Sequence, residues 1–269
     1  MKPFQHILIT RFNLKNETWV QDKNQVKVLD ASWLEKRYQL FDKYCFPSIK
    51  NQTEQDFIWL VYFDTETPKE YKRRNSAFAD HFKNFIPIYK DSFKHFVADL
   101  SHDIKKVLGD NVSFLITSRI DNDDAFHEDA IKTIQAQFNN QSRAIIDLRT
   151  GYCLQIKPQS RLYKANFELG PFISLIEKIN NGVFETVLCR AHKDWEKVND
   201  LSIIINTDML WAQIIHEHNL VNTVHGHLIL PDERIIKFHF KDGILMRFHL
   251  VFGYFKHHIK RQLKNMINV

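Results

Sequence analysis

The chain has 269 residues, of which 37 are Lys or Arg and 32 are Asp or Glu, giving a formal charge of +5, and 44% are hydrophobic. This balance is typical of globular proteins and excludes disordered, collagen-like and coiled-coil chains. Three well separated cysteines exclude a C-x-x-C pair, and seven glycines without a G-x-G exclude a dinucleotide fingerprint and a Walker-type loop. The longest apolar run, residues 57–63, is too short to span a bilayer, and no signal peptide begins the sequence, so we expect a cytoplasmic protein.

Strand and helix patterns alternate along the first half of the chain. Short apolar runs predict buried strands over residues 7–10, 57–63, 85–89 and 112–117. Each is separated from the next by a stretch long enough for a helix. Such alternation favours right-handed crossovers and a mainly parallel, three-layer α/β sheet.

Three helices are predicted between these strands. Residues 34–45 carry apolar side chains at helical spacing, and Pro47 is expected to stop that helix. In the second helix, Thr67 is expected to cap the amino terminus and Pro68 to occupy the first position. The third helix, over residues 93–108, has the clearest amphipathic pattern.

Shorter elements follow in the second half. Hairpin-length connections predict antiparallel strands over residues 144–148, 152–156 and 161–163. Beyond these we expect a helix over 172–179, a strand over 183–188, a helix over 208–215 and a strand over 224–228.

The carboxyl end is the most basic segment of the sequence. Residues 255–264 interleave apolar and cationic side chains, which predicts an amphipathic surface helix. Two interpretations stay open. Phe252, Phe255 and Ile259 could pack this helix against the protein, or the helix could adsorb to an anionic membrane face.

An acidic cluster follows the fourth predicted strand directly. Asp121, Asp123 and Asp124 stand within four positions, at a strand's carboxyl end, where open α/β sheets bind ligands. Mg²⁺ or Mn²⁺ would offset their repulsion and could bridge one or two carboxylates to substrate phosphates, so a diphosphate substrate is expected. The alternative is that Asp123 or Asp124 caps a helix carrying Ala130 and Ile131. Capping accounts for one aspartate rather than three, so we favour the metal.

A leading strand, a second strand ending in Asp64 and a fourth strand ending in Arg119-x-Asp121-x-Asp123-Asp124 follow one another in the sequence. This order resembles the GT-A nucleotide-sugar glycosyltransferases and, more narrowly, the bacterial rhamnosyltransferase family. The other similar segments are residues 10–13 (TRFN), 33–34 (WL) with Arg37, 44–48 (YCFPS), 59–61 (WLV), 63–64 (FD), 67–68 (TP), 171–177 (PFISLIE) and 211–216 (WAQIIH) with Asn219. Two departures are Glu217, where the family has glycine, and a missing proline near Met209.

This resemblance implies a fold and a set of site residues. The fold is a GT-A three-layer α/β/α sandwich, with residues 1–124 as the nucleotide-sugar-binding half, 125–246 as the acceptor-binding half and 247–269 as the basic helix. The implied donor-binding residues are Thr10, Arg11, Asn13, Asp64, Arg119 and Asp121. The implied ligands of Mn²⁺ or Mg²⁺ are Asp121, Asp123, Asp124 and His216. Arg11 could instead only neutralise the acidic rim.

An inverting sugar transfer also needs a base beside the acceptor hydroxyl. Asp208, at the start of the predicted helix over 208–215, is the first candidate, and a helix cap is its alternative role. Asp194 is the second candidate, and a surface turn is its alternative.

Together these features predict a metal-dependent, inverting glycosyltransferase of bacterial surface polysaccharide synthesis. Its donor would be a dTDP-, UDP- or GDP-linked sugar, with rhamnose suggested by the resemblance, and its acceptor a glycan or a lipid-linked glycan. The basic helix would let it contact the inner face of the membrane. Two rivals are a nucleotidyltransferase or other phosphoryl-transfer enzyme using Mg²⁺, and a basic module binding lipid or nucleic acid. A charge of only +5 argues against nucleic acid as a partner.

Overall fold

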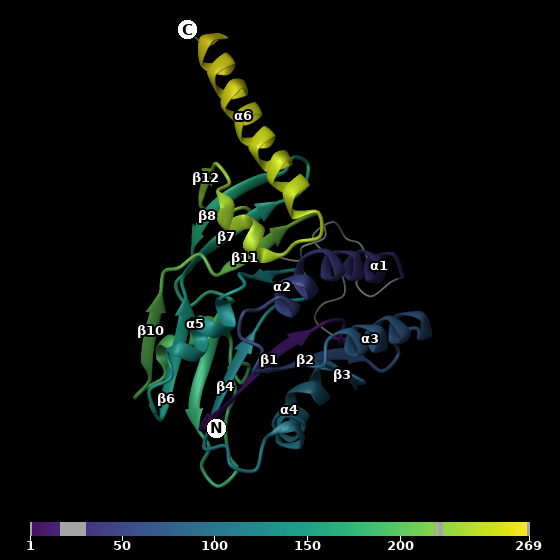
Figure 1. Cartoon of the computed structure of the whole chain (residues 1–269), viewed down its shortest axis with the longest axis vertical. Coiled ribbons are helices and arrows are strands. Elements are labelled where there is room, and N and C mark those ends of the chain that lie inside the picture. The colour runs from purple at the N-terminus through teal and green to yellow at the C-terminus, as the bar shows by residue number, and fades with distance from the viewer. Residues whose placement is uncertain (1, 17–30, 218, 220–222, 268–269) are drawn as a thin grey trace.

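A seven-stranded mixed sheet forms the centre of the protein (Figure 1). The computed structural model describes residues 2–16, 31–217, 219 and 223–267. The sheet has the order β10-β6-β9-β4-β1-β2-β3, and β4, β1, β2 and β3 run parallel, whereas β9 is antiparallel to both β4 and β6. Its strands are β1 (Phe4–Arg11), β2 (Ile58–Asp64), β3 (Phe85–Lys90), β4 (Phe114–Arg119), β6 (Arg143–Leu148), β9 (Ile173–Lys178) and β10 (Ser202–Asn206).

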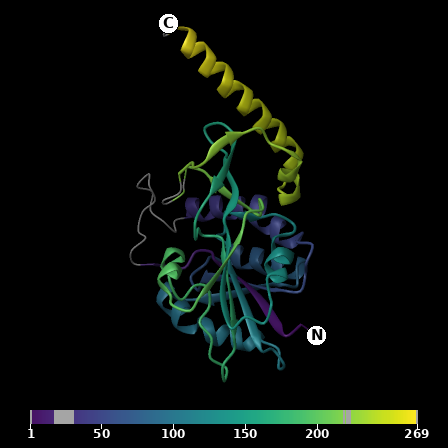
Figure 2. The ribbon, with the colours of Figure 1, turned by 90° about the vertical axis from the view of Figure 1, so that its left-hand side faces the viewer.

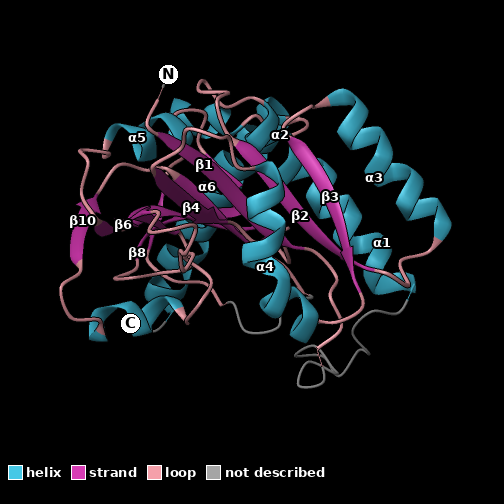
Figure 3. Ribbon diagram, turned by 90° about the horizontal axis from the view of Figure 1, so that it is seen from below, coloured by secondary structure: helices cyan, strands magenta, loops and turns pink. Residues whose placement is uncertain are grey.

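Helices cover both faces of this sheet, as Figure 3 shows from below. Along β2, Trp59 and Val61 pack in one core cluster with residues of α1, α3 and α5, whereas Leu60 and Tyr62 pack on the other face against α4. This alternation is the two-residue period of a strand buried on both sides. The predicted three-layer α/β sandwich is confirmed. The helices are α1 (Ala31–Leu40), η1 (Phe41–Cys45), α2 (Phe46–Lys50), α3 (Lys69–His81), α4 (Phe93–Val107), α5 (Ala130–Ala136) and η2 (His192–Lys197).

A second, smaller sheet lies above the carboxyl ends of the central strands (Figure 1). Its order is β12-β8-β7-β11-β5, formed by β5 (Ala125–Phe126), β7 (Thr150–Gln155), β8 (Arg161–Asn166), β11 (Trp211–Ile215) and β12 (His227–Ile229). Trp211 of β11 stacks on Phe172 and Phe167, with ring centroids 4.4 and 5.2 Å apart. These rings join the second sheet to the loop that precedes β9.

Two further elements pack on the second sheet. The short helix η3 (Glu233–Phe238) and the long helix α6 (Gly243–Ile267) bury Phe238, Met246 and Leu250 against it. The prediction that Phe252, Phe255 and Ile259 pack α6 against the protein is wrong, because all three are exposed. Among the described residues, none of the helices combines the length and apolar character that crossing a bilayer requires.

Three predicted elements of the second half are wrong. Residues 172–179, predicted as a helix, form β9, and residues 208–215, also predicted as a helix, contain β11. Both strands are hydrogen-bonded on two sides, and burial runs along them without alternation, so neither shows the two-residue period that distinguishes a strand from a buried helix. The predicted strand over residues 183–188 is a loop with one isolated bridge, between Val183 and Asn180.

Two helix boundaries also differ from prediction. Pro47 does not stop the first helix, because a π-helical turn precedes it and Pro47 then sits in the first turn of α2, where no backbone donor is needed. Thr67 does not cap α3, which begins at Lys69. Its hydroxyl donates instead to the carbonyl oxygen of Asp64, at 2.7 Å.

Candidate functional site

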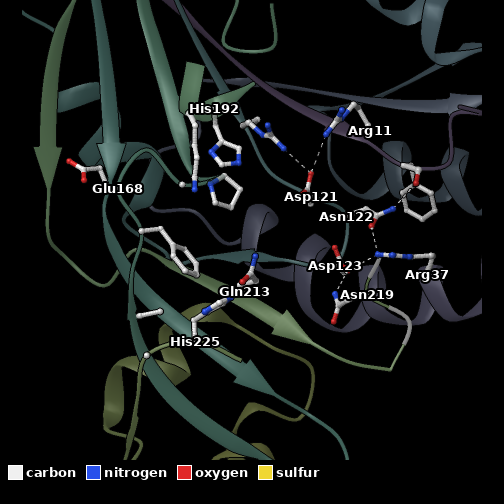
Figure 4. A pocket seen from close by; sticks show the side chains of 18 of the residues that line it. Arg11, Arg37, Asp121, Asn122, Asp123, Glu168, His192, Gln213, Asn219 and His225 are labelled. Carbon is white, nitrogen blue, oxygen red and sulfur yellow. Dashed lines mark hydrogen bonds and ion pairs between the residues drawn. The ribbon is translucent and has the colours of Figure 1, made fainter. Parts of the chain in front are cut away.

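A cavity of about 1350 Å³ lies between the carboxyl ends of β1 and β4 on one side and strands β8 and β12 on the other (Figure 4). Among the described residues that line it, five carry a positive charge and three a carboxylate. The cations are Arg11, Arg37, Arg119, Lys164 and Lys193, and the carboxylates are Asp121, Asp123 and Glu168. Such a surplus of cations favours an anionic ligand.

Asp121 lies at the mouth of this cavity, between two arginines. Its Oδ1 is 3.5 Å from Nη2 of Arg119 and 3.9 Å from Nη2 of Arg11. The Arg11 guanidinium also stacks over the Phe93 ring, 5.6 Å from its centroid. The Asp121 side chain is 39% exposed, so its carboxylate remains open to a ligand. Figure 4 shows the guanidinium group of Arg11 directed at this carboxylate.

Asp123 is bound to the scaffold. Its Oδ2 accepts from Nη1 of Arg37 at 2.5 Å, from Nε2 of His216 at 2.9 Å and from Nδ2 of Asn219 at 3.4 Å. Burial by itself would raise the pKa of Asp123, but the charge of Arg37 and the contact with His216 outweigh it and lower that pKa. Asp123 therefore stays ionised and ties α1 to the segment after β11.

Asp124 points to the other side of the loop and is buried. Its Oδ1 accepts from the backbone N–H of Ile214, at 3.0 Å. Burial, followed by the charges of Asp123 and Asp121, raises the pKa of Asp124. The alternative role of Asp123 and Asp124 as helix caps is also wrong, because α5 begins after Asp129, beyond strand β5.

The predicted metal ligands therefore do not form one cluster. Asp121 faces the cavity, the Asp123 carboxylate is occupied by Arg37, and Asp124 is not among the described residues that line the cavity. His216 directs Nε2 at Asp123. Within the part of the chain that the structure describes, no three His, Cys, Asp or Glu side chains are arranged to hold an ion. Of the four predicted ligands, Asp121 is the one whose carboxylate is open to the cavity.

Two of the predicted nucleoside contacts are buried below the cavity. Thr10 is fully buried and accepts from Nε1 of Trp59 at 2.9 Å. The Asp64 carboxylate is also buried and accepts from the backbone N–H of Lys15 at 3.3 Å. Asn13 lines the cavity and accepts from the backbone N–H of Asp64 at 3.2 Å. Asp64 therefore shapes the loop that presents Asn13, and neither Thr10 nor Asp64 is among the described lining residues.

A protein-family model described as "Putative rhamnosyl transferase" matches residues 5–227, from β1 into β12. The chain belongs to this family. The match includes both sheets and every predicted site residue named above. No curated protein matches the sequence of this rhamnosyl transferase family member.

Several solved structures are similar to this family member at low identity. S. aureus TarS 1-349 has a TM-score of 0.44 and 11% identity, covering 78% of this chain and 60% of that one. The same protein in complex with UDP-GlcNAc has a TM-score of 0.45 and 10% identity, covering 80% and 60%. The inositol-1-phosphate CTP transferase from T. maritima has a TM-score of 0.37 and 9% identity, covering 79% and 90%. The chain thus spans 60% of the TarS 1-349 structures and 36% of another TarS structure that it matches.

The two predicted bases of this rhamnosyl transferase family member lie outside the described cavity lining. Asp208 is exposed in the loop between β10 and β11, where its Oδ2 accepts from Nδ2 of Asn206 at 3.0 Å. The helix on which its prediction depended is a strand that begins at Trp211. The Asp194 side chain, on η2, is 48% exposed and accepts from Nζ of Lys197 at 2.7 Å.

Several cavity residues were missed from the sequence. Arg37 and Asn219 occur in the family-like segments, so a signal for them existed. Lys164, Lys193 and His192 carry no such local signal. The Nδ1 atom of His192 lies 2.5 Å from the carbonyl oxygen of Leu169, and because a carbonyl only accepts, Nδ1 carries the proton. Burial lowers the pKa of His192, although the Leu169 carbonyl raises it.

Proposed function

We propose that this chain is a glycosyltransferase that takes a sugar from a nucleotide-diphosphate donor and transfers it to a glycan or lipid-linked acceptor. The single observation that carries this proposal is the open carboxylate of Asp121 between Arg11 and Arg119, at the carboxyl ends of parallel strands. The family description supports a rhamnosyl donor, and surface polysaccharide synthesis is the process we propose.

The cations of the cavity suit a diphosphate leaving group. Breaking the bond from sugar to diphosphate builds negative charge on the leaving oxygens, and fixed donors aimed at that charge lower the barrier. Arg11 and Arg119 flank the cavity mouth, and Lys193 and Lys164 line other parts of it. Guanidinium groups can bind two phosphate oxygens at once, so the two arginines would grip the diphosphate while Asp121 limits their movement.

A divalent cation, Mn²⁺ or Mg²⁺, is part of this proposal. When bound, it would supply charge neutralisation of the leaving diphosphate. Asp121 would hold it together with phosphate oxygens, since this carboxylate is open to the cavity. Asp123 and His216 would instead hold the surrounding segments in place.

We propose His192 as the base of an inverting transfer. Its Nδ1 proton is directed at the Leu169 carbonyl, which leaves Nε2 of the neutral ring as an acceptor, and the residue lines the cavity. Glu168 is the other candidate from the lining, but Figure 4 shows its carboxylate pointing away from Asp121. Asp208 and Asp194 would then be surface residues.

Thermal melting with a panel of dTDP-, UDP- and GDP-sugars, each with Mn²⁺, Mg²⁺ or EDTA, tests the donor. At a ligand concentration of about 100 Kd, binding adds about 2.7 kcal/mol, which should raise Tm by roughly 5–10 °C. Arg119→Gln should weaken the shift with or without metal, and Asp121→Asn should remove the part that depends on metal.

Asp208→Asn is the matched control, because it neutralises an exposed carboxylate outside the described lining. The Tm of this variant should rise with donors as the Tm of the wild type does. If no nucleotide-sugar or nucleoside diphosphate shifts the melting point under any metal condition, the donor assignment fails. A shift with nucleoside triphosphates alone would favour the nucleotidyltransferase instead.

A further inference from the structure

Helix α6 is attached to the protein by one narrow face and extends beyond the body (Figures 1 and 2). Met246, Leu250 and Gly253, at helical spacing, are buried. A Cβ atom on Gly253 would lie 1.9 Å from the carbonyl oxygen of Ser160, so the helix backbone rests directly on the segment that leads into β8. The opposite face of α6 therefore points away from the protein.

That opposite face carries a stripe of large apolar side chains. Their exposure ranges from 52% to 68%, and spacings of mainly three and four residues place them along one side of the helix. At 1.5 Å per residue, the stripe is about 29 Å long. We call these residues the α6 stripe: Ile244, Leu245, Phe248, Phe252, Phe255, Ile259 and Leu263. A continuous apolar surface of this kind marks an interaction site.

The charge of α6 indicates which partner it fits. Residues 243–267 contain no Asp or Glu. By helical spacing, Arg247 lies on one side of the stripe, and Lys256 and Lys260 lie on the other. A second copy of the chain on the stripe would bring these like charges together. Anionic headgroups would neutralise them, and the aromatic residues suit the boundary between headgroups and acyl chains.

We infer that α6 is a peripheral membrane anchor that lies on an anionic lipid bilayer through the α6 stripe. The phenylalanines enter the interface and the lysines and arginines contact headgroups. This inference goes beyond the proposed sugar transfer, and it is argued from the residues of α6 alone.

Vesicle flotation of the full chain tests this inference, with phosphatidylcholine vesicles compared to vesicles containing half phosphatidylglycerol. The wild type should float with the anionic vesicles and much less with the neutral ones. Combined Phe248→Ser, Phe252→Ser and Phe255→Ser should lower the partition coefficient about tenfold or more, because the apolar contact is lost. Combined Lys256→Gln and Lys260→Gln should lower it roughly 30-fold on anionic vesicles, at about 1 kcal/mol for each cation.

The control replaces exposed valines elsewhere, Val97→Ser and Val183→Ser, and should bind as the wild type does. All variants change exposed side chains, so Tm and the donor-induced Tm shift should stay unchanged, and failure of the donor proposal would be seen separately. Equal binding to neutral and anionic vesicles, or wild-type binding by the phenylalanine variant, would overturn the anchor. So would a dimer in light scattering that the same variant dissociates while no lipid binds, since the stripe would then serve a second copy.

Discussion

Replacing Asp123 by Ala should destabilise the protein strongly, because this carboxylate is buried with a full charge opposite it. The Arg37 and Asp123 side chains are 9% and 6% exposed, and their atoms lie 2.5 Å apart. Without the carboxylate, Arg37 Nη1 would still donate to the amide oxygen of Asn122, at 3.2 Å, but this oxygen carries no formal charge that could compensate the guanidinium. Removing one partner of a buried ion pair costs about 3–5 kcal/mol. For a chain of this size that corresponds to a fall in Tm of roughly 6–20 °C.

Differential scanning fluorimetry at pH 7 measures this effect, with Asp121→Ala as the matched control. The Asp121 side chain is 39% exposed and its arginine contacts are 3.5 and 3.9 Å long, so its loss should change stability by no more than about 1 kcal/mol. Asp123→Asn keeps the shape of the side chain and should lie between the two. The reasoning is refuted if Asp123→Ala melts within about 2 °C of the wild type.

Two more predictions concern buried or fixed groups near the cavity. The raised pKa of Asp124 means that the folded state holds its proton more tightly than the unfolded state, so wild-type stability falls as pH rises from about 4 through the folded pKa. Asp124→Asn should remove this pH dependence of stability, so the Tm of the variant minus that of the wild type should increase between pH 5 and pH 8. A Tm difference that stays constant over this range would contradict the raised pKa of Asp124. His192→Asn should lower kcat about 100-fold or more while preserving the donor-induced Tm shift, whereas Asp194→Asn should leave turnover unchanged. Undiminished turnover by the His192 variant would assign the base elsewhere.

The first half of the fold could be predicted because each of its units is encoded locally. Strands β1 to β4 are short apolar runs, and α4 carries an amphipathic pattern that needs no knowledge of its neighbours. Strands β9 and β11 could not be predicted in this way. Their partners lie far along the chain, so Ile173 and Trp211 pair with residues whose positions only the tertiary structure sets.

The position of the site could be predicted from a general rule, whereas the contacts between its side chains could not. Ligands of open α/β sheets bind at the carboxyl ends of strands, and Asp121 lies there as expected. The ion pair of Asp123 joins it to Arg37, 86 positions away, and its other contact joins it to His216, 93 positions away. Residues separated this far along the chain form no local sequence pattern, so neither contact could be predicted from the sequence.

The three aspartates therefore divide between two tasks, although they are neighbours in sequence. Asp121 faces the cavity, whereas the other two belong to the scaffold: Asp123 compensates a buried guanidinium, and Asp124 accepts a backbone hydrogen bond. Lost activity in an Asp123 variant would thus report a disturbed scaffold as readily as a lost metal ligand. Only Asp121 combines an open carboxylate with little expected effect on stability, so variants of Asp121 are the ones that isolate the chemistry of a cation or diphosphate at this site.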